Sequence, residues 1–590
     1  MRNRLRIGLR LAELSLITVL MGSAVPHLAF AQATAAPAAT EQSAATDVVH
    51  QNAVVAADHP AASQAGLEML RQGGNVVDAA VATSFALSVV RPASCGIGGG
   101  GFMVIWNAER QEAVAIDYRE RAPAAATRDM FTRLDDKDAS RHGALAVAVP
   151  GTVAGLCFVA EKYGSLPLST LLQPAIRLAR DGVPIDDTER HFQASVLADL
   201  AQHDGDSDRF ATLRRLYLNG GQRWPRDATF RSPLLHVLQR IAKQGRDGFY
   251  RGDVAESIVA EMRRDGGIIT LEDLAGYQPT VRQPLRSRFH EHDIITMPPP
   301  SSGGVAIIEI LNMLEAARAS SPQFAGALQQ HNSPEYIHLV TECMKHAFAD
   351  RAEYLGDGDF VKLPLDRLTS PDYARQLVTR LDPDQTQPRD AYGRFRPTND
   401  SGTSHFSIID KAGNAVACTE TINTLYGSYV VEPKFGIIFN NQMDDFSATP
   451  GQPNAFGLLQ SEANTVAPHK RPLSSMSPTI VLRDGQARFV AGASGGPKII
   501  SATLQVLLNE ILFNETPEVA IRAPRFHHQW IPETLNLEPE LFDTAQKDLT
   551  QKRHTLKKAS GLGVAQSVSR SSDGLRGASD PRKSGRVAGY

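Results

Sequence analysis

The pattern of the chain changes at residue 403, and this change limits the folds open to it. Strands are expected at 102–106 and 113–118, and the region from 150 to 380 is mostly helical, with helices expected at 166–181, 234–244 and 334–355. After residue 403 the pattern is that of strands, expected at 403–409, 415–422, 436–440, 478–483 and 486–491. Helices are expected again at 497–513 and 516–523. Grouped strands and helices favour a layered α+β sandwich over an alternating βαβ array.

Size and charge narrow the class of protein further. The 590 residues, 42% hydrophobic and 21% charged, are enough for a large buried core. A formal net charge of -3 gives no reason to expect a nucleic-acid partner. The four cysteines are widely scattered without a CxxC pair, so we expect buried free thiols at Cys95, Cys157, Cys343 and Cys418.

The first 47 residues predict that the protein is exported and are not expected to belong to the folded domain. An arginine-rich start precedes an apolar stretch at 14–25, and Ala29-Phe30-Ala31 has small residues where a signal peptidase reads. We expect a signal peptide at 1–31, cut after Ala31, and a periplasmic or secreted product. The apolar stretch is shorter than the roughly 20 residues that a membrane span needs. Residues 32–47 are rich in Ala, Thr and Pro and predict a disordered linker.

A Gly402–Thr403 junction stands where the strands begin, after a polar, proline-rich segment at 382–402. A threonine hydroxyl is a weak nucleophile without an adjacent base, and cutting the chain before Thr403 would supply its free α-amine as that base. Glycine suits such a cut because it permits a strained peptide. The competing interpretation is an ordinary β-branched strand residue.

A second candidate nucleophile is Ser494 in the G-x-S-x-G pattern of residues 492–496. Its predicted context, strand then turn then helix, is that of a nucleophile elbow, and His527, His528 or His554 could complete a triad. The other functional interpretation is that Gly495 and Gly496 offer backbone N–H groups as an oxyanion hole.

Two patterns resemble cofactor sites, but the sequence around each argues against a cofactor. A G-x-G-x-x-G match at 96–101 precedes a strand, whereas a dinucleotide site needs a helix there. His338 and His346, with Glu342 between them, lie eight residues apart on one predicted helix, about 12 Å along its axis. One ion cannot bridge that distance. We therefore expect neither a metal nor another cofactor.

Several polar clusters follow apolar segments and could hold a zwitterionic ligand. Arg119 ends a predicted strand and could grip a carboxylate with two parallel hydrogen bonds, although a solvated charge cluster is the ordinary interpretation. Hydroxyls suit a carboxylate, while Asp and amide oxygens suit an ammonium. The clusters lie at 440–446 and 471–476, with Asn423 nearby in sequence.

The motifs together resemble γ-glutamyltranspeptidases over nearly the whole chain after residue 47. TSHFSIID, TETINTLYGS, GIIFNNQMDDFS, KRPLSSMSPTIV and ASGGPKII are similar to the family's small subunit, and GIGGGGFM, DYRERAP and ADRAEYLGD to its large subunit. The resemblance implies an N-terminal-nucleophile αββα four-layer sandwich made as one precursor. Self-cleavage at Gly402–Thr403 would leave a large subunit, 48–402, and a small subunit, 403–590, held together as a heterodimer.

The resemblance also implies a function and roles for individual residues. Thr403 would take the γ-glutamyl group from glutathione or related compounds and pass it to water, an amino acid or a peptide. The implied catalytic groups are Thr403, Thr421, which orients it, and the oxyanion donors Gly495 and Gly496. The implied substrate groups are Arg119, Ser474 and Ser475 for the α-carboxylate, and Asn423, Gln442 and Asp445 for the α-amine.

The same resemblance leaves three alternatives and one local departure. The segment 448–467 resembles a lid loop, in which Phe456 stands where a tyrosine is frequent, so no phenolic hydroxyl can bond to Asn423. A cephalosporin (glutaryl) acylase on the same fold is the second enzyme hypothesis, opposed by Asn423, Gln442 and Asp445. A Ser494 esterase and a non-catalytic binding protein are the others.

Overall fold

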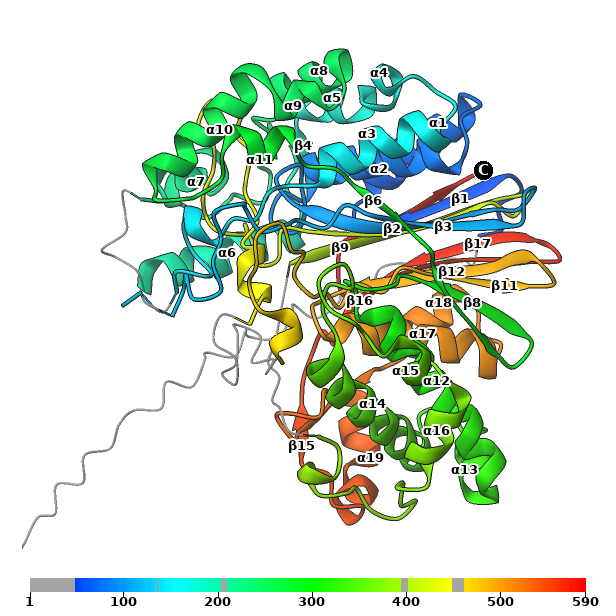
Figure 1. Ribbon diagram of the computed structural model, residues 1–590. Coiled ribbons are helices and arrows are strands. Elements are labelled where there is room, and N and C mark those ends of the chain that lie inside the picture. Colours follow the sequence, from blue (N-terminus) through cyan, green and yellow to red (C-terminus); the bar gives the residue numbers. More distant parts are fainter. Residues whose placement is uncertain (1–47, 133, 137, 203–208, 394–401, 448–460) are drawn as a thin grey trace, which may run out of the picture. The chain divides into compact units, whose positions relative to one another are not determined.

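Two antiparallel sheets pack face to face at the centre of the fold in the computed structural model of the chain (Figure 1). The structure describes residues 48–132, 134–136, 138–202, 209–393, 402–447 and 461–590, all within the unit that runs from Ala44 to Tyr590. The predicted signal peptide and linker, and Phe456 in the predicted lid, lie outside the described residues.

The first sheet has seven strands, and the candidate nucleophile begins one of its central strands. Its order is β18 (Arg586–Gly589), β1 (Ala53–Ala57), β9 (Thr403–Asp410), β10 (Ala415–Thr421), β2 (Gly100–Asn107), β3 (Glu112–Asp117) and β6 (Thr280–Arg282). β9 and β10 form the predicted hairpin, in a register that places Thr403 opposite Thr421.

The second sheet has six strands and lies against β9, β10 and β2. Its order is β17 (Gly574–Ser579), β16 (Val564–Ser571), β12 (Gln486–Ser494), β11 (Thr479–Arg483), β8 (His292–Thr296) and β7 (Leu285–Phe289). A smaller sheet joins β13 (Phe526–His527), β14 (Leu535–Leu537) and β15 (Leu556–Lys558), and β4 (Val183–Pro184) pairs with β5 (Thr229–Phe230).

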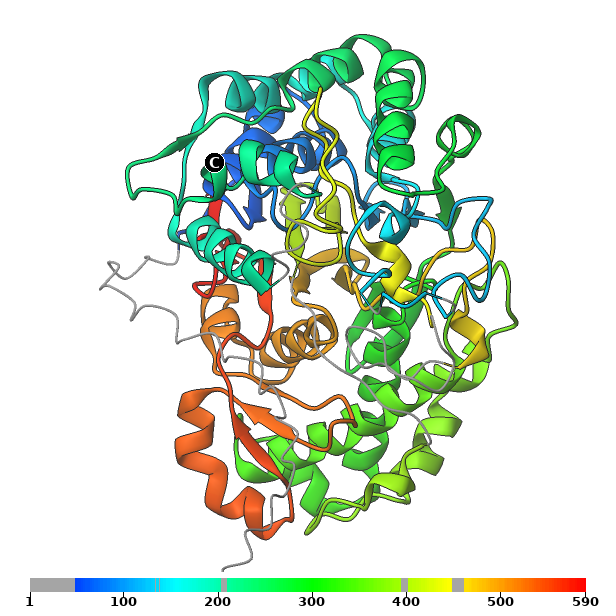
Figure 2. The ribbon, with the colours of Figure 1, turned by 90° about the vertical axis from the view of Figure 1, so that its left-hand side faces the viewer.

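Helices cover the outer face of each large sheet, as Figures 1 and 2 show. Against the seven-stranded sheet, a core cluster joins the strands to α1 (Pro60–Arg71), α2 (Val76–Val90), α3 (Thr152–Tyr163), α5 (Gln173–Asp181), α8 (Leu235–Gln244) and α10 (Gly252–Arg264). Against the six-stranded sheet the cluster includes α12 (Gly303–Ser320), α14 (Pro334–Tyr354), α17 (Lys498–Leu512) and α19 (Pro539–Gln551). The order helix, sheet, sheet, helix confirms the predicted four-layer α+β sandwich.

Other helices complete the connections between the layers. They are α4 (Leu168–Leu171), α6 (Asp187–Leu200), α7 (Ala211–Leu216), α9 (Asp247–Tyr250), α11 (Leu271–Ala275), α13 (Pro322–Ala327), α15 (Leu365–Leu368), α16 (Pro371–Val378) and α18 (Pro517–Arg522). Among the described residues no helix combines the length and the apolar character needed to cross a membrane.

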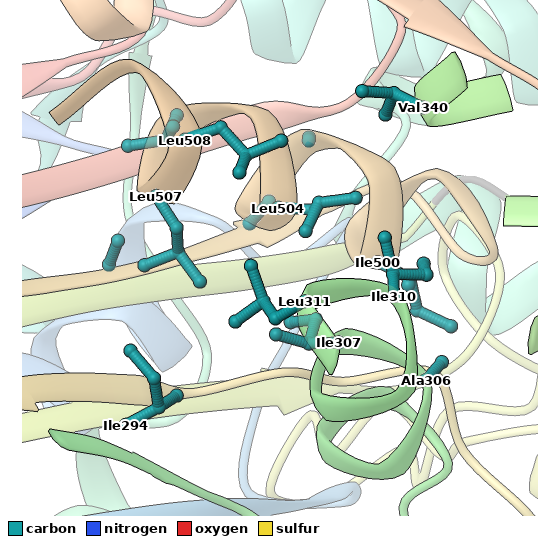
Figure 3. Packing of buried hydrophobic residues seen from close by; sticks show 14 of the residues in the cluster. Ile294, Ala306, Ile307, Ile310, Leu311, Val340, Ile500, Leu504, Leu507 and Leu508 are labelled. Atoms are coloured by element: carbon teal, nitrogen blue, oxygen red, sulfur yellow. The ribbon is translucent and has the colours of Figure 1, made fainter. Parts of the chain in front are cut away.

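Apolar side chains explain why α12 and α17 pack on the second sheet. Leu504 and Leu507 of α17 lie beside Ile307 and Leu311 of α12 in Figure 3, above Ile294 of β8. All five are fully buried. Burying side chains of this size stabilises a fold by about 1.5–3 kcal/mol each, before the entropy of ordering them is subtracted.

One predicted strand is wrong. Residues 436–440 contribute only an isolated bridge, Val431 with Ile438. Gly436 has a φ of 73°, and its N–H donates to the carbonyl of Glu432, so the chain turns where a strand would continue. Ile437 and Phe439 are nevertheless buried in the core of the first sheet, which accounts for the apolar pattern.

Candidate active site

The Thr403 hydroxyl is joined to the peptide bond before it through Thr421. Thr403 Oγ1 donates to Thr421 Oγ1 over 3.4 Å, and Thr421 Oγ1 donates to the Gly402 carbonyl oxygen over 2.8 Å. The backbone N–H of Asn423 also donates to Thr421 Oγ1, over 2.8 Å, which fixes the direction of its single hydroxyl proton. The Gly402–Thr403 peptide bond, which the sequence predicts to be cleaved, is therefore followed by the candidate nucleophile Thr403. Its carbonyl oxygen accepts a hydrogen bond from Thr421.

Gly402 is required by the close approach of the neighbouring backbone. A Cβ atom at this position would lie 2.7 Å from the carbonyl oxygen of Asn423 and 2.7 Å from the carbonyl carbon of Thr424. Backbone atoms cannot move aside as a flexible side chain can, so any larger residue would displace the junction. This close approach is a second reason for glycine before Thr403, besides the strain argument.

A cavity opens beside Thr403 and gathers most of the predicted site residues. Its lining comprises Arg119, Arg351, Thr403, Thr421, Asn423, Gln442, Asp445, Leu473, Ser474, Ser475, Met476, Gly496, Pro497 and Ile499. Gly402 and Gly495 adjoin this lining in the chain but do not form part of it. Residues from seven separate stretches of sequence thus meet at the start of β9.

Arg119 and Asp445 form a buried ion pair in the cavity. The Arg119 side chain is 1% exposed, and its Nη2 pairs with Asp445 Oδ2. The same guanidinium donates to the carbonyl oxygens of Pro472 and Leu473, at 3.3 and 3.1 Å. Gln442 Nε2 donates to Asp445 Oδ2 over 2.9 Å. The solvated-cluster interpretation of Arg119 is therefore wrong, because the side chain is enclosed and held in one orientation.

Burial shapes the electrostatics around this pair. Desolvation raises the pKa of Asp445, although Arg119 acts in the opposite direction. Desolvation also raises the pKa of the neighbouring Glu120 to about 8, and both of its carboxyl oxygens lack a hydrogen-bond partner among the described residues. At neutral pH Glu120 is therefore mostly protonated, and Asp445 is the main negative charge beside Arg119.

Ser474 and Ser475 also line the cavity. The Ser474 carbonyl accepts hydrogen bonds from the backbone N–H and the hydroxyl of Ser302, at 2.8 and 2.6 Å. Ser475 Oγ accepts from Arg351 Nη2 over 3.1 Å. The start of α12 and the end of α14 thus fix the segment that carries both serine hydroxyls.

Asn423 reaches the cavity from the end of the β9–β10 hairpin. It has a φ of 79°, in the left-handed region that asparagine tolerates better than most residues. Its side chain donates from Nδ2 to the Asn441 carbonyl over 3.0 Å, and the residue lines the cavity.

The Gly495–Gly496 turn brings backbone to the cavity just before α17. Both glycines have positive φ, 121° and 58°. Their carbonyls accept from the N–H groups of Lys498 and Ile499, at 3.2 and 2.9 Å, and so begin the helix. A side chain at either position would strain this turn. Gly496 itself lines the cavity near Thr403.

The Ser494 triad is not assembled. Ser494 ends β12 as the pattern predicts, but its hydroxyl donates to the Val564 carbonyl over 3.5 Å. His527 instead binds Ser501 through Nδ1, at 2.8 Å, and Gln529 through Nε2, at 3.0 Å. All of these side chains are buried. This arrangement supports the fold near α17 and gives no base to Ser494 among the described residues.

The other discarded patterns also have structural explanations. Gly98 and Gly99 pack against backbone, where a Cβ would lie about 2 Å from the carbonyl oxygens of Ile438 and Thr421. His338 does meet a second histidine, His554, at 2.8 Å from Nδ1 to Nε2, with Glu342 nearby. That carboxylate already accepts from two hydroxyls, those of Thr386 and Tyr392, and pairs with Lys345. A buried ammonium there competes with any cation, so we assign no metal to the cluster.

Two residues near Thr403 were missed by sequence reasoning. Lys583 donates to the Thr403 carbonyl over 3.2 Å and pairs with Asp58, which ties the start of β9 to the chain's C-terminal segment. Arg351 lines the cavity itself. It lies in ADRAEYLGD, a motif noted only for its resemblance, and helical periodicity cannot tell such a residue from a core position.

Comparisons with known proteins agree with this geometry. The family described as Gamma-glutamyltranspeptidase matches residues 62–590. "Glutathione hydrolase proenzyme" of Escherichia coli is 41% identical over 92% of this chain and 93% of its own, and that of Pseudomonas aeruginosa is 40% identical over 93% and 96%.

Solved structures place the fold in the same group. A cephalosporin acylase from Bacillus halodurans superposes with a TM-score of 0.82 at 26% identity, covering 95% of this chain and 99% of its own. The γ-glutamyltranspeptidase of Helicobacter pylori has a TM-score of 0.51 at 39% identity, over 57% of this chain and 93% of the solved chain. The chain belongs to the γ-glutamyltranspeptidase family and is an enzyme with the N-terminal-nucleophile hydrolase fold.

Proposed function

We propose that this protein is a glutathione hydrolase and γ-glutamyltransferase that first cleaves its own chain between Gly402 and Thr403. The observation that carries the proposal is the Thr421 hydroxyl, which donates to the Gly402 carbonyl and accepts from the Thr403 hydroxyl. Relatives named glutathione hydrolase proenzymes support both the substrate and the precursor.

In the self-cleavage step, Thr403 Oγ1 adds to the carbonyl carbon of Gly402. The Thr421 hydroxyl stabilises the negative charge that develops on the carbonyl oxygen, a contribution worth roughly 3–4 kcal/mol per donor in well-studied hydrolases. The C–N bond then breaks as the Thr403 nitrogen takes up the hydroxyl proton, which leaves an ester. Water hydrolyses the ester, giving a carboxylate on Gly402 and a free α-amine on Thr403.

In turnover, the freed α-amine of Thr403 takes the proton of its own hydroxyl, which attacks the γ-glutamyl amide carbon. Backbone N–H groups of Gly495 and Gly496 stabilise the oxyanion. The amine half of glutathione leaves with a proton, and an ester between the γ-glutamyl group and Thr403 remains. Water, or the amine of an amino acid or peptide, then takes the γ-glutamyl group and restores the hydroxyl.

Recognition of the γ-glutamyl end uses the two charges that pair in the cavity. Arg119, with Ser474 and Ser475, takes the α-carboxylate, while Asp445, with Asn423 and Gln442, takes the α-amine. A zwitterionic end group replaces one buried ion pair by two, so no charge is left uncompensated. A ligand that lacks either charge would leave one partner of the Arg119–Asp445 pair unsatisfied at the moment of binding.

The proposed subunits, 48–402 and 403–590, share both large sheets. β9, β10 and β18 of the small subunit lie among β1, β2, β3 and β6 of the large one, and β7 and β8 extend the second sheet. The solved H. pylori chain supports such processing, since 57% of this chain accounts for 93% of it.

Export is part of the same proposal. The arginine-rich start and short apolar stretch support removal of residues 1–31 and a periplasmic or secreted enzyme. Sequencing the N-terminus of the large subunit tests this, because a product that begins at Gln32 or later agrees with it and one that begins at Met1 contradicts it.

A cephalosporin acylase activity is the second candidate, favoured by the B. halodurans structure. Glutaryl side chains lack the α-amine that Asp445, Asn423 and Gln442 are proposed to bind. Hydrolysis of γ-glutamyl and glutaryl anilides by the purified enzyme separates the two candidates. We expect the γ-glutamyl anilide to have the higher kcat/KM by a factor of 100 or more, on the order expected when buried polar groups lose their partner. A preference for the glutaryl anilide would support the acylase.

A further inference from the structure

Arg351 lines the cavity and carries a pair of hydrogen-bond donors that have no partner among the described residues. It lies in the last turn of α14, and 2% of its surface is exposed. Its Nε donates to Ser302 Oγ over 2.7 Å and its Nη2 to Ser475 Oγ over 3.1 Å. Its Nη1 is buried and has no hydrogen-bond partner among the described residues, and the side chain lines the cavity beside Thr403.

In the described part of the chain, no carboxylate forms an ion pair with Arg351. Both of its established hydrogen bonds are to neutral hydroxyls. Asp445 is the carboxylate that acts on it electrostatically, and Asp445 already pairs with Arg119. Desolvation lowers the pKa of Arg351 to about 10, so the guanidinium stays charged at neutral pH. A buried cation without a partner is costly, and an anion bound beside it would remove that cost.

We propose that Arg351 is a second guanidinium for the α-carboxylate of the γ-glutamyl group, which it binds through Nη1 next to the hydroxyls of Ser474 and Ser475. The inference rests on the proposed function and adds a binding residue to it. Arg351 has the features of such a residue: an enclosed position, a free pair of N–H donors, an unmatched positive charge and a direct bond to Ser475.

A purely positioning role predicts something different. Arg351 also supports the backbone of Ser474 through Ser302, whose hydroxyl donates to the Ser474 carbonyl. If support were its whole role, replacing it would impair every substrate equally, whether or not the substrate carries an α-carboxylate. The charge of the substrate therefore separates direct binding from support.

The test compares two substrates on the same preparation of Arg351→Gln enzyme. One is a γ-glutamyl anilide, and the other is the same anilide with its α-carboxylate converted to the primary amide. We expect kcat/KM for the acid to fall by about 10- to 100-fold, as for the loss of a charge-assisted hydrogen bond. We expect kcat/KM for the amide to change by less than about threefold. Because the comparison is a ratio, it does not depend on the fraction of folded enzyme.

Arg351→Lys and Arg367→Gln complete the set of variants. The lysine keeps the positive charge but lacks the forked N–H donors of a guanidinium. We therefore expect Arg351→Lys to recover part of the preference for the acid substrate over the amide. Arg367, on α15, is exposed, stacks on Tyr354 and Tyr373 and does not line the cavity. Its replacement should therefore leave kcat/KM unchanged for both the acid and the amide substrate. Equal losses for acid and amide in Arg351→Gln would overturn the inference.

Competitive inhibition by L-glutamate gives a second readout that needs no turnover of the amide. Its inhibition constant should rise at least tenfold in Arg351→Gln and be partly restored in Arg351→Lys. An unchanged constant contradicts the inference. Failure of the wild-type enzyme to hydrolyse the γ-glutamyl anilide at all would instead contradict the proposed function, which keeps the two failures distinct.

Discussion

At the scale of single residues, Thr421 is the group on which both proposed chemical steps depend. In the uncut chain its hydroxyl has one proton and three partners, and the N–H of Asn423 orients that proton toward Gly402. The same hydroxyl remains beside the Thr403 hydroxyl after cleavage, since β9 and β10 hold the two residues opposite each other. In the proposed mechanism, the precursor and the mature enzyme therefore use one contact for two purposes.

Replacing Thr421 by Val keeps the shape of the side chain and removes the hydroxyl. We expect self-cleavage to slow by about 100-fold or more, the usual effect of losing one donor to an oxyanion. The time course of precursor loss on denaturing gels measures this. Thr421→Ser is the matched control and should cleave within about tenfold of the wild-type rate. Cleavage of the Val variant at the wild-type rate would remove Thr421 from the mechanism.

Glu120 gives a prediction about stability and pH. Burial raises its pKa to about 8 in the folded chain, so the folded state keeps a proton that the unfolded chain loses near its ordinary pKa of 4.5. The free energy of unfolding should therefore fall as pH rises from about 5 to 8 and level off above that. The difference in free energy of unfolding between Glu120→Gln and wild type should therefore shift in favour of the variant by more than about 1 kcal/mol when the pH rises from 5 to 8.5, since a shift of one pKa unit is worth about that much. Urea titrations at both pH values measure it, and a constant difference would contradict the assignment.

At the residue scale, the sequence singles out candidates where a residue type is tied to backbone chemistry. The Gly402–Thr403 junction and the Gly495–Gly496 turn are of this kind, because few residues tolerate those backbone positions. Arg351 and Lys583 were not found. Their place near Thr403 depends on where the tip of a long side chain lies after folding, which the sequence pattern does not record. Arg119 was found, although its burial could not be inferred from a run of charges.

At the scale of elements, the contact between β9 and β12 positions the nucleophile. Gly492 of β12 faces His405 of β9, where a Cβ would lie 2.2 Å from the imidazole Cε1. His405 is itself held by Thr419 and Ser407, at 2.8 and 3.0 Å, and burial lowers its pKa to about 3, so the ring is neutral. The ring is two residues from Thr403 and on the same face of the strand.

We expect Gly492→Ala to push the two sheets apart at this point. The free energy of unfolding should fall by about 1–3 kcal/mol, typical of overpacking in a core. Gly326→Ala is the control, because it lies in α13 with nothing within 4 Å of the added Cβ, and it should be neutral or slightly stabilising. Chemical denaturation of both variants measures the effect. Equal stabilities would show that His405 can move aside without cost.

Element types were largely predictable, because periodicity records which face of an element is buried. The hairpin at 403–421 and the helices near 234–244 and 334–355 were placed within a residue or two. The strand expected at 436–440 failed because an apolar run is also what a buried irregular segment requires, and Gly436 bends it. Which strands become neighbours, such as β1 with β9, depends on residues hundreds of positions apart.

At the scale of the whole molecule, cleavage at Gly402 would cut the chain without separating its layers. Each of the two large sheets contains strands from both sides of the junction, and Lys583 near the C-terminus contacts the carbonyl of Thr403. The two products would have to break two sheets to part. We therefore expect them to elute together in native size-exclusion chromatography and to separate only under denaturing conditions. Elution of the small product by itself would contradict this account.

The central claim is that Thr403 first cuts the chain and then serves as its N-terminal nucleophile. Denaturing electrophoresis of the purified protein, with N-terminal sequencing of each band, tests it most directly. We expect two bands, the smaller beginning Thr-Ser-His-Phe, and a single uncut band for Thr403→Ala. A wild-type protein that stays in one piece while hydrolysing γ-glutamyl anilides, or a Thr403→Ala variant that still yields two bands, would contradict the claim.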